Sequence, residues 1–437
     1  MTPRVAVVHP QLVAGGGSEA CAMWTLQALQ DESRLTLVTM GRPDLGSMNR
    51  KYGTTVDENK IEVRFLRLPP GTRKRFDALR GFRLARYCRR HARDFDVMIS
   101  AYNVMDFGVA GIQMIADFSF DDALRRELHA ESGAAGGGFY PFADAKPRLS
   151  GRGYEARLRV NPEQAPVLLG PGLGSPAPAF MPRSPGVYKA SLMRSLYLGL
   201  GRRLAGSRGD GWKRNLTVAN SEWTRDLLRE RFGVASNVVY PPVVGDFPTV
   251  PWSEREDGFV VIGRLVPEKG VRRVIEILGD VRKEKPVHLH IIGRRERTAH
   301  AREIEELCRR NRDWIHLEGE IYGPEKAAFL ARHKYGISGC RNEAFGIAVA
   351  EMVKAGSLVW VPDGGGQKEV VAHPGLVYSG RDHAASLILA ALGEPAAEAA
   401  LRYHLEARAD LFSSGRFVEE MRGIVRGFLA EKHVRCA

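Results

Sequence analysis

The stretch Asn342–Glu351 reads NEAFGIAVAE and is followed by three consecutive glycines, Gly364–Gly366. It carries two carboxylates, Glu343 and Glu351, that stand eight positions apart. If a helix begins near Phe345, this separation spans up to ~12 Å of axial rise, so the two groups perform different tasks. A carboxylate pair that cleaves one glycosidic bond would instead need roughly 5–9.5 Å between its members. The spacing therefore indicates two separate tasks. Taken alone, the pair also fits a solvated helix carboxylate at Glu351 and a helix-start residue near the helix dipole at Glu343.

A second polar motif lies earlier in the chain, where Gly263–Gly270 reads GRLVPEKG directly after the expected strand 259–262. Arg264 and Lys269 flank the turn that this motif predicts. A planar guanidinium and a compact ammonium can hold a diphosphate together, and ligands bind at the carboxyl ends of parallel strands. Taken alone, the motif also fits a surface loop with solvated cations.

Apolar runs of strand length alternate with helical patterns along most of the chain, which predicts an α/β protein with parallel sheets covered on both faces. The first run, residues 4–10, leads into the glycines 15–17 and then a helical stretch, 20–29. Further expected strands are 35–39, 63–66, 97–100, 112–115 and 216–220, then 259–262, 287–292, 315–318, 335–338 and 358–361.

A chain of 437 residues is long enough for two domains with a ligand cleft between them. We expect a first Rossmann-like domain over residues 1–245, a linker over 246–256 and a second such domain over 257–410. Residues 411–437 are expected to form a final helix. Residues 133–186, rich in Gly, Pro and Ala, read as an insertion or long loop within the first domain.

Four motifs in this order resemble the retaining glycosyltransferases of the GT-B fold, particularly family 4 (group 1). They are a Gly-Gly loop after the first strand, Ala-Asn-Ser at 219–221, the Gly-Arg-x4-Lys-Gly motif and the Glu-x7-Glu motif. The resemblance extends from residue 4 to about 430. It implies an acceptor-binding first domain, a donor-binding second domain and a final helix that packs back on the first. It also implies transfer of a hexose from a UDP- or GDP-sugar to a hydroxyl, with retention at the anomeric carbon.

The resemblance also implies a role for each motif residue. Arg264 and Lys269 would stabilise the departing diphosphate, Glu343 would reach the transferred sugar, and Glu351 would accept hydrogen bonds from the ribose. Further donor contacts would come from backbone groups of both domains, at Gly15, Gly16, Gly263, Phe345, Gly346 and Ile347. A helix N-terminus near the last three favours phosphate. Neither a metal nor another cofactor is expected, because the two cations serve the leaving group.

One departure from the family pattern concerns a histidine that many members carry just after a strand of the first domain. The corresponding stretch, residues 113–118, reads QMIADF, with Ala116 where the histidine is expected. Asp117 could supply the missing polar contact from nearly the same place. Alternatively, the acceptor supplies it, or the site is weakened and the protein binds nucleotide sugar or carbohydrate without turning it over.

Three other candidate sites are less favoured. Asp94-Phe95-Asp96 has the DxD spelling of a metal-binding motif but only joins a helix to a strand. His288 and His290 share a strand face, although two histidines without further ligands more often pack than bind zinc. The glycines 15–17 lack the spacing of a dinucleotide site, which argues against NAD.

The charge balance, 64 Lys and Arg against 51 Asp and Glu, predicts an anionic partner. The segment Arg73–Arg93 concentrates nine of these cations and reads either as an ordinary amphipathic helix or as a contact with an anionic membrane. A nucleic-acid-binding protein is a rival interpretation, but no recognised motif accompanies the charge.

The absence of an 18-residue apolar run, of a leader and of paired cysteine motifs leads us to expect a cytoplasmic protein, with the inner membrane face as an alternative location. Tyr240-Pro241-Pro242 and the basic first domain are similar to mannosyltransferases that act on lipid-linked or polysaccharide acceptors, which mildly favours GDP-mannose. A soluble small-molecule acceptor is the other possibility.

Overall fold

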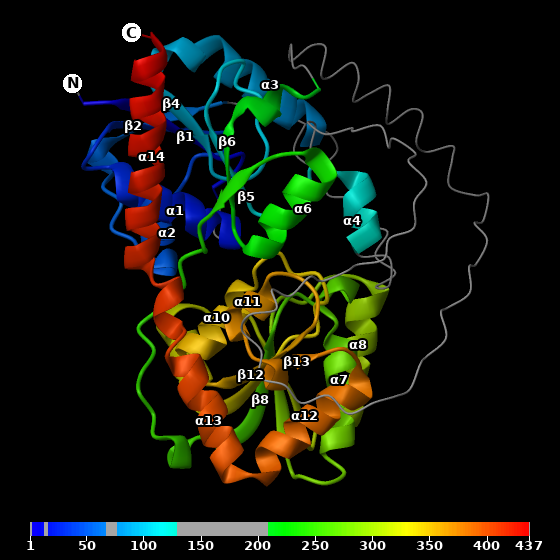
Figure 1. The fold of residues 1–437 in the computed structure, drawn as a ribbon. Coiled ribbons are helices and arrows are strands. Elements are labelled where there is room, and N and C mark those ends of the chain that lie inside the picture. The colour runs from blue at the N-terminus through cyan, green and yellow to red at the C-terminus, as the bar shows by residue number, and fades with distance from the viewer. Residues whose placement is uncertain (1, 13–15, 67–76, 129–208, 437) are drawn as a thin grey trace, which may run out of the picture.

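The structure is a computed structural model that describes residues 2–12, 16–66, 77–128 and 209–436. Two lobes, each built on one parallel sheet, lie one above the other (Figure 1). The predicted insertion, residues 133–186, lies outside the described residues, as does Gly15.

The first lobe contains a seven-stranded parallel sheet with the order β3-β2-β1-β4-β5-β6-β7. Its strands are β1 (Arg4–Val8), β2 (Arg34–Thr39), β3 (Ile61–Phe65), β4 (Val97–Ser100), β5 (Ile112–Ile115), β6 (Leu216–Ala219) and β7 (Ser236–Val238). The helices are α1 (Gly17–Leu29), α2 (Leu45–Tyr52), α3 (Asp77–His91), α4 (Asp122–Leu128) and α6 (Glu222–Phe232). Along β1, Val5 and Val7 enter one apolar core whereas Ala6 and Val8 enter the other. The alternation of a strand thus fills both faces of this sheet.

The second lobe contains a six-stranded parallel sheet with the order β10-β9-β8-β11-β12-β13. Its strands are β8 (Glu256–Ile262), β9 (His288–Ile292), β10 (Ile315–Gly319), β11 (His333–Ile337), β12 (Leu358–Pro362) and β13 (Val377–Tyr378). The helices are α7 (Val271–Val281), α8 (Ala299–Arg310), α9 (Gly323–Ala331), α10 (Ile347–Lys354), α11 (Gln367–Val371), α12 (Arg381–Gly393) and α13 (Pro395–Glu406). One continuous apolar core joins these elements.

The last helix, α14 (Ser414–Cys436), returns to the first lobe and packs along α1 (Figure 1). Its side chains Phe417, Met421 and Val425 are buried in the first lobe's core, at the helical spacing of four. Arg422 Nε donates to the carbonyl of Ala28 over 2.7 Å. This return agrees with the architecture that the resemblance implies.

All the strands expected from the sequence are present, although β8 begins three residues earlier than predicted. The short strands β7 and β13 were not expected. The helix expected to begin near Phe345 is α10, which begins two residues later, at Ile347. Gly346 has a φ of +94°, which no α-helical residue adopts, so the helix can begin only after it.

Within the described ranges, no single helix is long and apolar enough to cross a membrane. One pair of helices, bent by 106° between Arg381–Gly393 and Pro395–Phe412, meets the criterion jointly by length and composition.

Candidate active site

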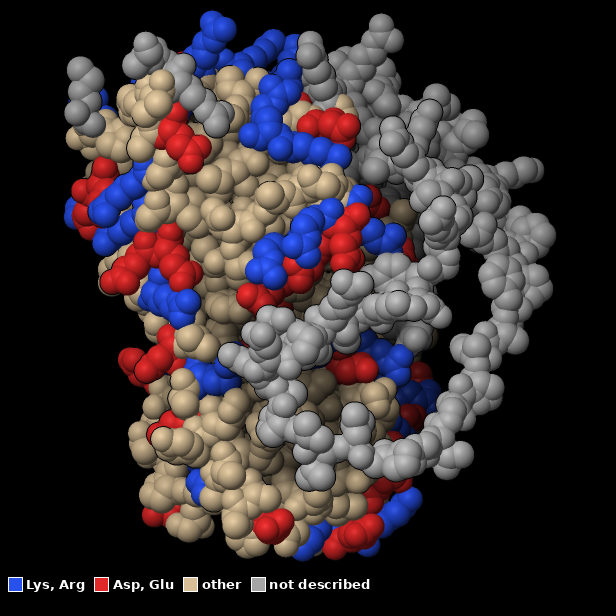
Figure 2. All heavy atoms as spheres, in the orientation of Figure 1, with Lys and Arg blue, Asp and Glu red and all other residues tan. Residues whose placement is uncertain are grey.

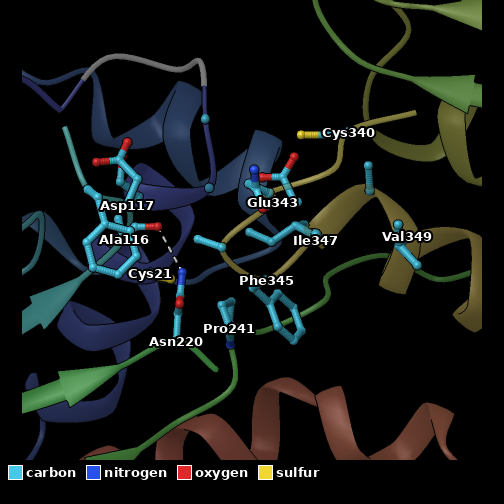
Figure 3. A pocket seen from close by; sticks show the side chains of 18 of the residues that line it. Cys21, Ala116, Asp117, Asn220, Pro241, Cys340, Glu343, Phe345, Ile347 and Val349 are labelled. Carbon is cyan, nitrogen blue, oxygen red and sulfur yellow. Dashed lines mark hydrogen bonds between the residues drawn. The ribbon is translucent and has the colours of Figure 1, made fainter. Parts of the chain in front are cut away.

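A cavity of about 690 Å³ lies between the two lobes, at the carboxyl ends of strands from both sheets. Gly16, Gly17 and Asp117 line it from the first lobe. The second lobe contributes a larger set, which includes Arg264, Lys269, Glu343, Phe345, Gly346 and Ile347. Gly263, which directly precedes Arg264, is not among the described residues that line the cavity. In Figure 3, Asp117 and Glu343 enter the cavity from opposite sides. The fold thus gathers most of the residues selected from the sequence, at the edge where open parallel sheets bind ligands.

The carboxylate of Glu343 forms an ion pair with the ammonium group of Lys269, 74 positions earlier. Burial alone would lower the pKa of Lys269, but the Glu343 carboxylate outweighs it and raises that pKa. The lysine therefore stays charged. Arg264, by contrast, is exposed at the cavity and has no ion pair with any described residue. One cation of the motif is held in place and the other is available to an anion.

The loop that carries Glu343 rests against the glycines 364–366. Gly365 has a φ of +75°, and a Cβ there would lie 2.3 Å from the Glu343 carbonyl oxygen. A Cβ on Gly364 would lie 2.1 Å from the carbonyl oxygen of Arg341. The amide of Gly366 donates to the Glu343 carbonyl over 2.8 Å. Only glycine residues, which have no side chain, can approach the Glu343 loop this closely, so the triple glycine positions that loop.

The start of α10 faces the cavity, and it meets the first lobe's glycine loop there. A Cβ on Gly17 would lie 2.5 Å from Cδ1 of Ile347, so this glycine permits the two lobes to approach closely. Phe345 is only 2% exposed, and its ring packs 5.7 Å from Tyr240 and 5.5 Å from Phe412. The first amides of α10 are thereby aimed into a space suited to phosphate.

Glu351 lies on α10 but is not among the described residues that line the cavity. Its carboxylate forms an ion pair with the ammonium of Lys326 on α9 over 2.5 Å, and its side chain is 12% exposed. The expected contact with a ribose stays a prediction, and it would require the carboxylate to share or exchange this partner.

Asp117 is held in place by Asn103, a residue that the sequence did not suggest. The amide of Asn103 donates to Oδ1 of Asp117 over 2.9 Å, and its own Oδ1 accepts from the backbone N–H of Ala116 over 3.0 Å. Asn103 has a φ of +150°, a conformation that costs energy for a residue with a side chain. Directly after β6, Asn220 donates to the Ala116 carbonyl over 2.9 Å (Figure 3). The turn where the family histidine was expected is therefore rigid, and its one carboxylate faces the cavity.

Glu369 connects the two lobes beside the cavity. Its carboxylate accepts hydrogen bonds from the backbone N–H groups of Glu222 and Trp223, each over 2.8 Å, at the start of α6. The hydroxyl of Tyr240 donates to it over 3.1 Å. Burial raises the pKa of Glu369, although these donors oppose the shift. The sequence did not suggest this role for Glu369.

The acidic pair of the DxD spelling is engaged outside the cavity. Asp96 accepts from the backbone N–H of Arg4 over 2.8 Å and from its guanidinium over 3.0 Å, which lowers the pKa of Asp96. Asp94 contacts His91 Nδ1 over 2.7 Å. These contacts fit the interpretation of a structural connection between helix and strand.

The described part of the basic segment forms α3, whose apolar residues Phe82, Leu84 and Cys88 are buried. Arg83, Arg86 and Arg90 are exposed. Figure 2 shows Lys and Arg side chains gathered at the end of the first lobe where α3 lies. The arrangement is that of an amphipathic helix with an arginine-rich solvent face, and a membrane contact stays a prediction.

Comparisons with known proteins bear on the fold of the chain. Residues 256–393 match the family model "Glycosyl transferases group 1". The sucrose-phosphate synthase of Thermosynechococcus elongatus superposes with a TM-score of 0.62 at 14% identity, covering 98% of this chain and 100% of that one. Anabaena HepE, crystallised with UDP and glucose, superposes with a TM-score of 0.61 at 12% identity, covering 97% and 99%. The chain has the GT-B fold.

Two curated relatives of this GT-B chain are named as GDP-Man:Man(3)GlcNAc(2)-PP-Dol alpha-1,2-mannosyltransferases. The one from Homo sapiens is 27% identical over 286 residues, which is 59% of this chain and 56% of the relative. The one from Neurospora crassa is 26% identical over 189 residues, covering 35% and 34%. The chain thus spans about half, or less, of the length of these relatives.

Proposed function

We propose that this GT-B chain is a retaining glycosyltransferase that moves a hexose, with mannose preferred, from a nucleoside-diphosphate sugar to a hydroxyl acceptor. The observation that carries the proposal is the juxtaposition of Arg264, Lys269 and Glu343 with the glycine loop of the other lobe around one cavity. Mannose is preferred because both curated relatives are named as GDP-mannose-dependent enzymes.

In the proposed reaction, the diphosphate lies between the start of α10 and the two cations. The bond from the anomeric carbon to the diphosphate oxygen breaks, and charge grows on that oxygen. Arg264 and Lys269 stabilise this charge, a kind of contribution worth several kcal/mol in a preorganised site. The acceptor oxygen bonds to the same face of the anomeric carbon, and its proton passes to the departing phosphate. Neither a protein nucleophile nor a metal takes part in this scheme.

Glu343 and Asp117 would orient the reactants from the two sides of the cavity. Glu343, fixed by Lys269, would accept a hydrogen bond from a hydroxyl of the transferred sugar. Asp117, fixed by Asn103, would accept one from the sugar or from the acceptor. The acceptor would be a lipid-linked or polysaccharide hydroxyl, and the names of the curated relatives specify a lipid-linked oligosaccharide.

The first test is donor binding. Thermal unfolding is followed with GDP, UDP, GDP-mannose and UDP-glucose, because a ligand that binds only the native state raises its stability. We expect one nucleotide class to raise the unfolding temperature. Arg264→Ala should abolish that rise, whereas Arg312→Ala, which removes an exposed arginine outside the cavity, should preserve it. No response to any nucleotide, or an equal loss in both variants, would contradict the proposed donor site.

The second test is transfer. With the preferred donor and a mannose-containing acceptor panel, Glu343→Gln should lose at least 100-fold in rate while it remains folded. NMR of the product should show the anomeric configuration of the donor, and excess EDTA should leave the initial rate unchanged. Inverted product would rule out retention. Donor binding without turnover on any acceptor would instead favour a nucleotide-sugar-binding protein.

A further inference from the structure

A cluster of imidazoles lies at the other end of the second sheet, at the amino ends of its strands. Among the described residues, Glu256, His288, His290 and His333 each offer one ligand atom, and these four atoms lie within 4.8 Å of one another. Glu256 and His333 are the first residues of β8 and β11, and His288 and His290 stand on β9. Because β9, β8 and β11 are neighbours and parallel, their amino ends meet at one edge.

The register of these strands explains why the side chains share a face. His333 pairs with Glu256, and His288 pairs with Gly258, two positions further along β8. Alternate residues of one strand point to the same face of the sheet, and so do paired residues of neighbouring strands. Positions 256, 258, 288, 290 and 333 therefore share one face. A Cβ on Gly258 would lie 2.4 Å from Nε2 of His288 and 2.7 Å from Cδ2 of His333. The glycine thus leaves the room into which the imidazoles converge.

In two of the histidines, contacts of Nδ1 leave Nε2 as the ligand atom. His333 Nδ1 lies 2.7 Å from the carbonyl oxygen of Phe329, and His290 Nδ1 lies 2.7 Å from Oε1 of Glu318. A carbonyl or carboxylate accepts the Nδ1–H, which leaves the lone pair on Nε2. Both Nε2 atoms are buried and have no hydrogen-bond partner among the described residues. Histidines that bind metal almost always donate their other ring N–H in this way.

The remaining two groups complete a four-ligand set. Oε2 of Glu256 lies 3.6 Å from Nε2 of His288 and 3.7 Å from Nε2 of His333. In tetrahedral zinc sites with bonds of about 2.0–2.2 Å, ligand atoms stand roughly 3.3–3.6 Å apart, so small movements suffice. The Glu256 side chain is 51% exposed and His288 is 29% exposed, which leaves them free to make these movements.

Burial also favours the neutral form of these imidazoles. It lowers the pKa of His288 and His290 and lowers that of His333 to about 4. A neutral imidazole is the form that binds metal.

We propose that Glu256, His288, His290 and His333 bind one zinc ion or a similar divalent transition metal, as a structural site of the second lobe. Three imidazole nitrogens and one carboxylate oxygen are ligands that zinc accepts. Glu318 and the Phe329 carbonyl act as positioning groups for His290 and His333. The site ties three neighbouring strands together. It lies apart from the donor cavity, because Ile262 stands six positions beyond Glu256 along β8, about 20 Å of strand.

The test uses the full chain without a histidine tag, stripped with EDTA and returned to chelator-free buffer. Zn²⁺ is titrated by calorimetry, and metal content is measured after gel filtration. We expect one equivalent of Zn²⁺ per chain and a higher unfolding temperature. Co²⁺ in place of Zn²⁺ should give the visible absorption of a tetrahedral site.

Glu256→Gln combined with His288→Gln removes the two exposed ligands and should preserve the fold, since neither side chain is in the core. This double variant should weaken Zn²⁺ binding at least 100-fold. Glu318→Gln should weaken it by 10- to 100-fold, as expected of a group that orients a ligand. His433→Gln, which removes an exposed histidine from α14, should bind as the unaltered chain does.

Equal binding by the double variant and the unaltered chain would overturn the proposal, because the metal would then lie elsewhere on the surface. Failure of the unaltered chain to retain about one equivalent through gel filtration would overturn it as well. Sugar transfer is not a readout in this experiment, so the result stands whether or not the proposed reaction is observed.

Discussion

Gly365→Ala is the sharpest test of how the cavity is built, because this glycine has two separate reasons to lack a side chain. Its φ of +75° lies in the left-handed region, where an L-residue costs about 1–2 kcal/mol. An added Cβ would also lie 2.3 Å from the carbonyl oxygen and 2.7 Å from the nitrogen of Glu343. Real Cβ atoms essentially never approach another heavy atom closer than 3.0 Å, so the backbone must give way by at least 0.7 Å, the difference between 3.0 and 2.3.

The displaced backbone belongs to Glu343 itself, which separates the effect on stability from the effect on transfer. Overpacking of this kind costs about 1–3 kcal/mol, so the total loss in unfolding free energy is about 2–5 kcal/mol. A misplacement near 1 Å in a catalytic site can lower the rate about 100-fold. We therefore expect Gly365→Ala to retain a folded population and to lose about two orders of magnitude in transfer.

Gly233→Ala supplies a matched control. Gly233 ends α6 with a φ of +65°, but a Cβ there would have no atom of the described residues within 4 Å. This variant should lose only the backbone cost, about 1–2 kcal/mol, and transfer normally. Urea unfolding and initial transfer rates are measured on both. If Gly365→Ala is no less stable than Gly233→Ala and transfers at a similar rate, the triple glycine does not position Glu343.

Three further predictions concern the contact between the lobes and the interior of the first lobe. Glu369→Gln should destabilise the chain by about 1–3 kcal/mol in urea, since one of the two N–H groups at the start of α6 loses its acceptor; a loss below 0.5 kcal/mol would contradict this. Burial lowers the pKa of His9 from 6.5 to about 3, so the unfolded chain takes up a proton below pH 6.5 and stability falls as the pH falls. The loss in unfolding free energy reaches about 3 kcal/mol by pH 4. Between pH 7 and pH 4, His9→Leu should therefore lose about 3 kcal/mol less stability than the unaltered chain; identical pH dependence of the two would exclude the effect. Phe417→Ala should cost about 3–5 kcal/mol, because it leaves a cavity where α14 enters the first lobe's core; thermal unfolding within 1 °C of the parent would show that α14 adds little.

The architecture could be predicted because its signals are local and repeated. Apolar strand patterns, the helices between them and the glycine after the first strand each occupy a few neighbouring residues. The same holds for Arg264 and Lys269, whose turn follows directly from β8. Two short strands at sheet edges, β7 and β13, were missed because three or two residues carry no periodicity. The start of α10 was placed two residues early, since the sequence does not show the positive φ of Gly346.

The remaining site features depend on residues that are distant in sequence, and no local pattern marks them. Asn103 reaches Asp117 across 14 positions, and Glu369 reaches Glu222 across 147. His288 and His290 could be placed on one face of a strand from their spacing alone. Glu256 and His333 join them only because β8 and β11 become neighbours in the sheet order. Chain topology, rather than composition, brings these groups together.

The sheet of the second lobe separates two kinds of chemistry along the same strands. At its carboxyl edge, backbones approach so closely that side chains are excluded: a Cβ on Gly293 would lie 1.8 Å from the Gly263 carbonyl, and one on Gly270 would lie 2.2 Å from that of Gly339. Such contacts leave the amides and two cations to face an anion. At the amino edge, imidazoles converge where Gly258 leaves room for them. A metal there would stabilise β8, the strand that leads into the turn of Arg264 and Lys269, without entering the reaction, because about 20 Å of strand separates the two edges and the charge is screened over that distance.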